Sequence, residues 1–198
     1  MDAYNVPVGP AAARGPRYRF RNPSGPALVA QALIASAAIA DIYVILTGGA
    51  ESPWLKDAVP LPGLLQVACW ISFLVWFFRV RCNAEVLATG SHKYTPAFAL
   101  GAWIIPLAMW WLPRRIMLDI RRAGGLPRDA LLINAWWFVW LCDGPLSVAV
   151  HLLILHQTDY HNPVDQVISV LDSILAIAVI RRVTADQPAG PLPYFNMT

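Results

Sequence analysis

The chain has 198 residues, of which 57% are hydrophobic and only 14% are charged, and its formal net charge is +3 at pH 7. This length leaves room for one compact domain, and the apolar residues are gathered in long blocks rather than in alternating or helical stripes. The few basic clusters lack the interleaved aromatic residues typical of nucleic-acid binding, so nucleic acid is not expected as a partner.

Five apolar segments follow one another along the chain, each close to the roughly 20 residues that a helix needs to cross a hydrocarbon core of about 30 Å. They comprise residues 27–48, 61–78, 96–112, 130–155 and 164–180. We therefore predict an all-α integral membrane protein with a single helical membrane domain over residues 27–184. Residues 1–26, rich in Pro, Gly and Arg, are predicted to form a flexible basic arm, and residues 185–198 a flexible tail.

The distribution of Lys and Arg constrains the topology, because cytoplasmic loops carry the excess of these residues. Five simple crossings would divide the fifteen basic residues seven against eight. If segment 96–112 enters and leaves on the same side, every basic residue except Lys56 falls on that side. Pro106 removes a backbone donor in the middle of this segment and Pro113 follows its end. We therefore predict four spans, one re-entrant or in-plane segment and both termini in the cytoplasm; five spans are the alternative.

Two features are predicted to mark the inner face. Indole rings favour the headgroup boundary, so we expect most of a group of six tryptophans there, namely Trp76, Trp110, Trp111, Trp136, Trp137 and Trp140. The basic stretch 114–122 is predicted to be a membrane-surface helix, with Ile116, Met117 and Ile120 toward lipid and its arginines toward anionic headgroups. A docking site for a partner protein is the alternative for this stretch.

Three aspartates within the apolar segments are the candidate intramembrane polar site. At a rise of 1.5 Å per residue, Asp41, Asp143 and Asp172 all lie about 18 to 21 Å from the inner boundary of the core. Because a charge at this depth costs about 3 kcal/mol or more, such residues normally face the bundle interior. They either bond neighbouring helices together, or form a shared site for a proton or cation, and both hypotheses remain open.

A second group of polar residues is predicted on the outer side. His151, His156, Asp159 and His161 carry side chains that bind Zn or Cu, although their spacing matches no established zinc pattern and a solvated loop is the default reading. The three cysteines, Cys69, Cys82 and Cys142, form no paired framework. No nucleotide-binding or hydrolase motif is present, so no cofactor and no catalytic residues are expected.

Several short stretches between residues 65 and 187 follow a distinctive order, with Arg79, Asn83, Trp103, Pro106 and Pro113 as characteristic residues. Together they resemble a family of bacterial membrane proteins catalogued as domain of unknown function 4328. This chain departs from the family pattern at Ala97, where Gly is usual, and at Met109, where Asn is frequent. The resemblance implies a helical architecture and a location in the bacterial plasma membrane, but no activity.

The leading functional hypothesis is a non-enzymatic membrane component, either an accessory or assembly subunit or a scaffold. Its expected partners are the bilayer with anionic inner-leaflet lipids and another membrane protein or a second copy of the chain. The alternative is a small transporter or channel for protons or divalent cations that uses the aspartate layer. An enzyme ranks third, because no nucleophile and base can be paired.

Overall fold

The computed structural model describes residues 18–47, 60–88, 92–124, 130–150, 153 and 163–187. These ranges are helical with short turns and contain no strand, which confirms the all-α prediction for them. Residues 1–17 of the predicted arm and 188–198 of the predicted tail lie outside the described ranges.

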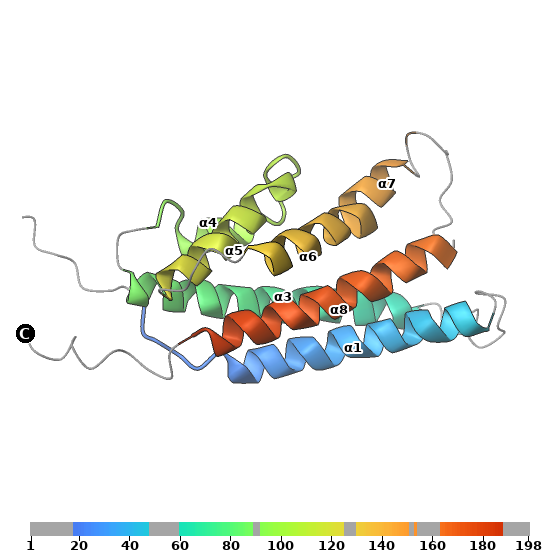
Figure 1. Ribbon diagram of the computed structural model, residues 1–198, viewed down its shortest axis with the longest axis horizontal. Coiled ribbons are helices and arrows are strands. Elements are labelled where there is room, and N and C mark those ends of the chain that lie inside the picture. Colours follow the sequence, from blue (N-terminus) through green and yellow to red (C-terminus); the bar gives the residue numbers. More distant parts are fainter. Residues whose placement is uncertain are drawn as a thin grey trace, which may run out of the picture.

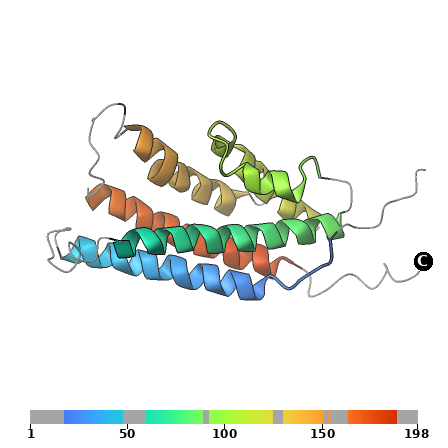
Figure 2. The same ribbon diagram turned by 180° about the vertical axis from the view of Figure 1, so that it is seen from behind.

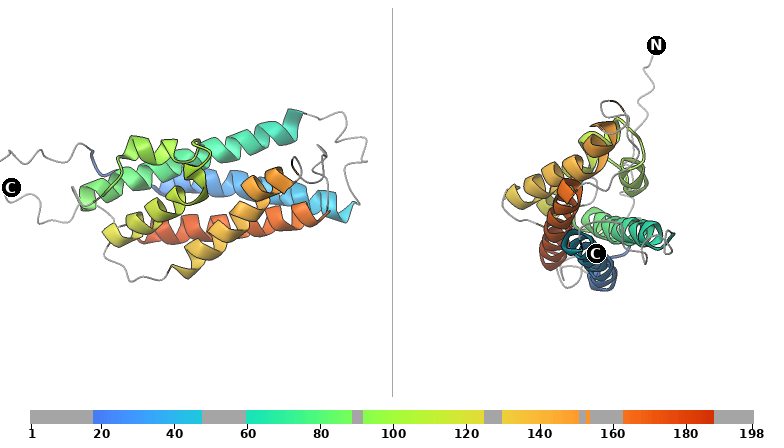
Figure 3. Two further views of the ribbon diagram at one scale, coloured as in Figure 1. Left: turned by 90° about the horizontal axis from the view of Figure 1, so that it is seen from above. Right: turned by 90° about the vertical axis from the view of Figure 1, so that its right-hand side faces the viewer.

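The helices form two layers (Figure 1). One layer consists of three long helices that run side by side, α1 (Ser24–Leu46), α3 (Pro60–Leu87) and α8 (Pro163–Ala185). The other layer begins with the short helices α4 (Pro96–Gly101), η1 (Ala108–Trp110) and α5 (Leu112–Ala123). It continues as one interrupted helix through α6 (Leu131–Leu141), the π-helical η2 (Cys142–Leu146) and α7 (Ser147–Val150). The end-on view separates the two layers (Figure 3, right).

Three stretches are long and apolar enough to cross a membrane: Ser24–Leu46, Pro62–Leu87 and Leu131–Val150. Each is apolar on most of its circumference, so residues that do not face the bundle remain exposed, as Leu28 and Ile39 do on α1. Such exposure suits a lipid environment rather than water. α8 is as long as α1 but carries Asp165, Asp172 and two arginines, and it does not meet the same criterion. A fourth span therefore stays a prediction.

Segment 96–112 is broken into two short helices joined by turns. The Thr95 hydroxyl accepts a hydrogen bond from the Phe98 N–H at 3.2 Å and caps α4, which has Pro96 in its first turn. Turns follow α4, and Pro106 lies within them where it cannot support an α-helical hydrogen bond. α5 then returns, with Pro113 in its first turn. Together, α4, η1 and α5 thus form a helical hairpin rather than a straight helix.

The hairpin begins and finishes at the same end of the molecule (Figures 1 and 2). At its start, the Arg81 guanidinium of α3 donates to the Tyr94 carbonyl. At its finish, Arg121 of α5 pairs with Asp186 after α8, with 3.1 Å between Nε and Oδ2. This geometry is the one that a re-entrant segment requires. The position of the hairpin relative to a bilayer stays a prediction.

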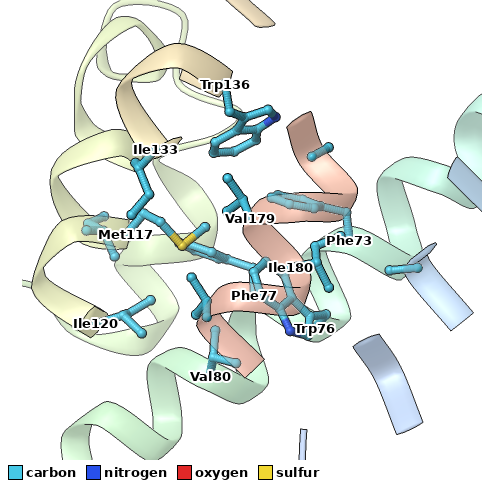
Figure 4. Close-up of a cluster of buried hydrophobic side chains, with 14 of the residues drawn as sticks. Phe73, Trp76, Phe77, Val80, Met117, Ile120, Ile133, Trp136, Val179 and Ile180 are labelled. Carbon is cyan, nitrogen blue, oxygen red and sulfur yellow. The ribbon is translucent and has the colours of Figure 1, made fainter. Parts of the chain in front are cut away.

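The centre of the protein is an apolar core to which both layers contribute (Figure 4). Phe73, Trp76, Phe77 and Val80 of α3 meet side chains from three other helices, namely Met117 and Ile120 of α5, Ile133 and Trp136 of α6, and Val179 and Ile180 of α8.

This core corrects the prediction for stretch 114–122. Its apolar residues Ile116, Met117 and Ile120 are each at most 1% exposed, because α5 packs on α3 and α6 rather than on lipid. The prediction that these side chains face lipid is therefore wrong.

The core also corrects the expectation for the tryptophans. Trp76, Trp136, Trp137 and Trp140 are buried among other side chains, and only Trp110 and Trp111 are exposed. An indole is large enough to fill the space between helices. Trp103 lies at the centre of an aromatic cluster, in ring contact with side chains of α3 and α6, and the cluster continues through Trp136 and Trp137. Most of these tryptophans therefore fill the core rather than mark a membrane boundary.

Candidate functional site

A π-helical segment brings a carboxyl group to the interior of the bundle. Pro145 lies inside η2 and has no N–H to donate to the preceding turn. The backbone widens there into π-helical geometry, which is frequent at functional sites. Asp143 and Gly144 of this segment line a cavity.

The cavity has a volume of about 210 Å³ and lies between the two layers. One part of its wall is aromatic and is formed by Trp70, Phe73, Trp103, Trp136 and Trp140. The other part is polar and is formed by Gln66, Asp143, Ser169, Asp172 and Ser173. Ile34, Ala37, Cys69 and Ala176 complete the described lining together with Gly144. Every long helix of the fold contributes to this one site.

The structure brings the three predicted aspartates to this cavity in different ways. Asp41 does not line it but accepts a hydrogen bond of 2.9 Å from the Ser169 hydroxyl, which does. That bond joins α1 to α8. Asp143 and Asp172 both line the cavity. One aspartate is thus engaged between helices, and two face an open space.

The two aspartates at the cavity have few partners in the described part of the chain. Oδ1 of Asp172 is buried and has no hydrogen-bond partner. Neither Asp143 nor Asp172 forms an ion pair with a described Lys or Arg, and no basic side chain is among the described lining residues. A buried acceptor without a protein partner needs water, a proton or a ligand.

Two indole N–H groups of the aromatic wall are also buried and have no acceptor among the described residues. They are the Nε1–H groups of Trp103, which is 4% exposed, and Trp136, which is 2% exposed. Figure 4 shows the Trp136 nitrogen turned away from Ile133, on the side of the ring that faces α8. Both indoles and Asp172 belong to the lining residues, but these three polar atoms are covered by neighbouring groups rather than open to the cavity.

The predicted histidine group cannot be placed, since His151, His156, Asp159 and His161 all lie outside the described residues. Within the described ranges, no three His, Cys, Asp or Glu side chains are arranged to hold a metal ion. The aspartates are therefore not grouped as a three-carboxylate metal site.

The family-like residues are mainly structural in this arrangement. Asn83 is fully buried and makes two hydrogen bonds to the backbone of Arg21, of 2.8 Å and 3.0 Å. Trp103 is the one family-like residue that lines the cavity. Pro113 is buried at the start of α5, Pro106 is exposed in the hairpin turn, and Arg79 is partly buried on α3.

Several residues of the site were missed by reasoning from the sequence. Along α8, Asp172 and Ser173 follow Ser169 at three and four residues, so all three lie on one side of the helix. That spacing was a usable signal. Gln66 and Trp70 repeat at four residues on α3, but nothing in the sequence indicates that their face meets Asp143.

Comparison with known proteins adds one finding. The model of a family described as a domain of unknown function, DUF4328, matches residues 58–185. The match includes α3 to α8 and the cavity residues on them, while α1 precedes it. No curated protein and no solved structure matches the chain.

Proposed function

We propose, from the premise that this chain belongs to the DUF4328 family, that it is a non-enzymatic membrane protein that binds a small ligand inside its helix bundle. The family description names no activity, so the proposal depends on the cavity. The observation that supports it best is a cavity inside an apolar bundle that is lined by two acidic residues, Asp143 and Asp172, and by an aromatic wall.

A catalytic role is less well supported by the same residues. The described lining holds two serines, a cysteine and two aspartates, but no histidine and no lysine that could serve as a base beside a nucleophile. Carboxylate and aromatic walls instead suit binding or passage of a positively charged species. The proposal is therefore compatible with both earlier hypotheses. A binding component that retains its ligand is an accessory protein, and one that releases it on the other side of the membrane is a transporter.

A purely structural role is the second candidate, and the Asp41–Ser169 bond favours it. A hydrogen bond between α1 and α8 inside an apolar bundle is the usual device by which polar residues hold membrane helices together. Such a protein would act as a scaffold or assembly subunit, and the cavity would then hold only water.

The proposed topology has four spans, with the α4–η1–α5 hairpin re-entering the bilayer and both termini in the cytoplasm of a bacterium. The hairpin tip supports this proposal, because Ile104 and Leu107 are more than 70% exposed and would face lipid there. The positive-inside distribution supports it independently. Anionic inner-leaflet lipids would then meet the exposed Arg122 and Lys93.

A native cysteine, Cys69, can report whether small solutes enter the cavity. Cys69 and Cys82 both lie on α3 and are buried to the same extent, at 6% and 7% exposed, but only Cys69 lines the cavity. Two single-cysteine variants of the full chain, C82A/C142A and C69A/C142A, therefore form a matched pair. We expect a small neutral methanethiosulfonate to label Cys69 at least about tenfold faster than Cys82, because thiol reactivity requires access.

The result also separates the two candidate functions. Labelling of Cys69 that is as slow as that of Cys82, in protein that remains folded and monodisperse, would mean that small solutes do not enter the cavity. The binding proposal would then fail and the scaffold role would remain.

A further inference from the structure

We infer that the cavity binds a small organic cation, with an ammonium group held between the aromatic wall and the aspartates Asp143 and Asp172. This inference rests on the proposed binding function and specifies the chemical class of its ligand. Four features of the cavity lead to it, namely ring geometry, charge, size and entry.

Three indoles of the wall are arranged edge to face with one another. The ring centroids of Trp70 and Trp103 lie 6.3 Å apart, those of Trp70 and Trp140 6.0 Å, and those of Trp103 and Trp140 5.4 Å, with interplanar angles of 83°, 65° and 88°. The three packed rings come from different elements and form one continuous aromatic part of the cavity wall. Aromatic rings attract ammonium groups through cation–π interactions, and Trp gives the strongest such attraction.

The charge of the lining has one sign. Asp143 and Asp172 contribute carboxyl groups, while no Lys or Arg is among the lining residues that the structure describes. A carboxylate that is removed from water without a partner is costly, and a cation beside it offsets that cost. The ligand that completes this site is therefore positively charged.

The size and the ligand set favour an organic cation over a metal ion. A cavity of about 210 Å³ exceeds the roughly 150 Å³ that suffices for a benzene-sized molecule, so a bare ion would leave most of it empty. Within the described ranges no three ligating side chains are grouped for a metal.

The cavity has an entry on the α3 side. Gln66 is exposed and yet belongs to the lining, so it lies at the mouth. It is about two turns from the start of α3. Arg81 and Arg121 belong to the last turns of α3 and α5, and these two helices finish at the opposite end of the molecule (Figures 1 and 2). A cation that approaches from this end meets the carboxyl groups without passing the arginines.

The test uses choline, tetramethylammonium and 3,3-dimethylbutan-1-ol, the neutral carbon analogue of choline with nearly the same shape. Each is added to the full-length C82A/C142A variant in lipid nanodiscs, and the rate of Cys69 labelling by a neutral reagent is measured. We expect the two cations to slow labelling in a saturable manner, by about tenfold at saturation, and the neutral analogue to leave the rate unchanged.

Substitutions then locate the contacts. Asp172→Asn, which keeps the shape but removes the charge, is expected to weaken cation binding by about tenfold or more. Trp70→Leu is expected to weaken it by about 5- to 30-fold, as the loss of a desolvated cation–π contact does. Asp119→Asn, which changes a carboxylate on α5 that is paired with Arg122 and far from the lining, is the matched control and should change nothing.

The outcomes distinguish this inference from the function on which it rests. If Cys69 is reactive but no cation protects it, or if the neutral analogue protects equally, the assignment of an organic cation is wrong and the binding function stands. If Cys69 does not react at all, both fail. If Asp172→Asn does not fold, Trp70→Leu tests the same site from its aromatic side. An unchanged affinity for the two cations in that variant would equally contradict the inference.

Discussion

Asn83 shows how a single residue can connect two distant parts of this chain. It is fully buried on α3, donates its amide N–H to the Arg21 carbonyl at 2.8 Å, and accepts the Arg21 N–H at its Oδ1 at 3.0 Å. Both hydrogen-bonding groups of one backbone unit are thus satisfied by one side chain. The chain that enters α1 is thereby held against α3, at the end of the molecule where α8 also finishes.

We predict that Asn83→Leu lowers the free energy of unfolding by about 1 to 3 kcal/mol, because it leaves partly buried backbone groups without partners. Denaturant titration in mixed micelles measures this change. Limited trypsin digestion gives a second readout, since cleavage after Arg21 should become faster than in the parent. Asn22→Ala is the control: Asn22 bonds only the nearby Ser24 N–H on the surface, so its loss should not speed that cleavage. If trypsin cleaves after Arg21 no faster in the Asn83 variant than in the parent, the hydrogen bonds between Asn83 and Arg21 do not hold this part of the chain.

At the scale of elements, α5 illustrates what an amphipathic pattern can and cannot predict. The sequence correctly indicated a basic helix with one apolar face, and α5 covers Leu112–Ala123. It could not indicate what covers that face, because lipid tails and protein side chains are equally apolar. The answer depends on α3 and α6, which pack against α5. The same limit applies to the tryptophans, whose sequence positions suit a membrane boundary and a protein core alike.

We predict that Met117→Ala costs about 2 to 5 kcal/mol of stability, the usual range for a truncation that leaves a cavity in a packed core. Met117 is completely buried. Arg115→Ala, on the exposed side of the same helix, should change stability by no more than about 0.5 kcal/mol. Both are measured by the same titration. Similar small effects for the two variants would mean that α5 lies on the membrane surface, as the pattern alone suggested.

For the whole molecule, the order and type of the elements could be predicted, but the site could be predicted only in part. Within the described residues, four of the five apolar segments are helical, because long apolar blocks leave the backbone no other way to satisfy its hydrogen bonds in a membrane; segment 96–112 is instead broken by turns. Counting helical rise predicted one depth for Asp41, Asp143 and Asp172; in the structure Asp143 and Asp172 line one cavity, and Asp41 bonds its lining residue Ser169. The aromatic wall was not predicted, because Trp103 comes from the broken segment and no periodicity relates it to Trp70 or Trp140.

The topology itself is testable on the complete chain. In a cysteine-free variant, we expect Lys56→Cys and Asp159→Cys to react with an impermeant thiol reagent applied from outside the cell. Lys93→Cys and Arg122→Cys, placed before and at the end of the hairpin on exposed positions, should react only after permeabilisation. Reaction of Arg122→Cys from outside while Lys93→Cys stays protected would mean that segment 96–112 crosses the membrane fully.

The hydrogen bond between Asp41 and Ser169 also has a consequence for how the protein is made. The two residues are 128 positions apart, and at about 5 to 20 residues per second synthesis of the intervening chain takes about 6 to 25 s. During that interval the first helix has emerged while the hydroxyl that will satisfy its carboxyl group does not yet exist. Biogenesis therefore includes a period in which Asp41 depends on a proton, a water molecule or the insertion machinery, and its bond to α8 forms only after α8 has been made.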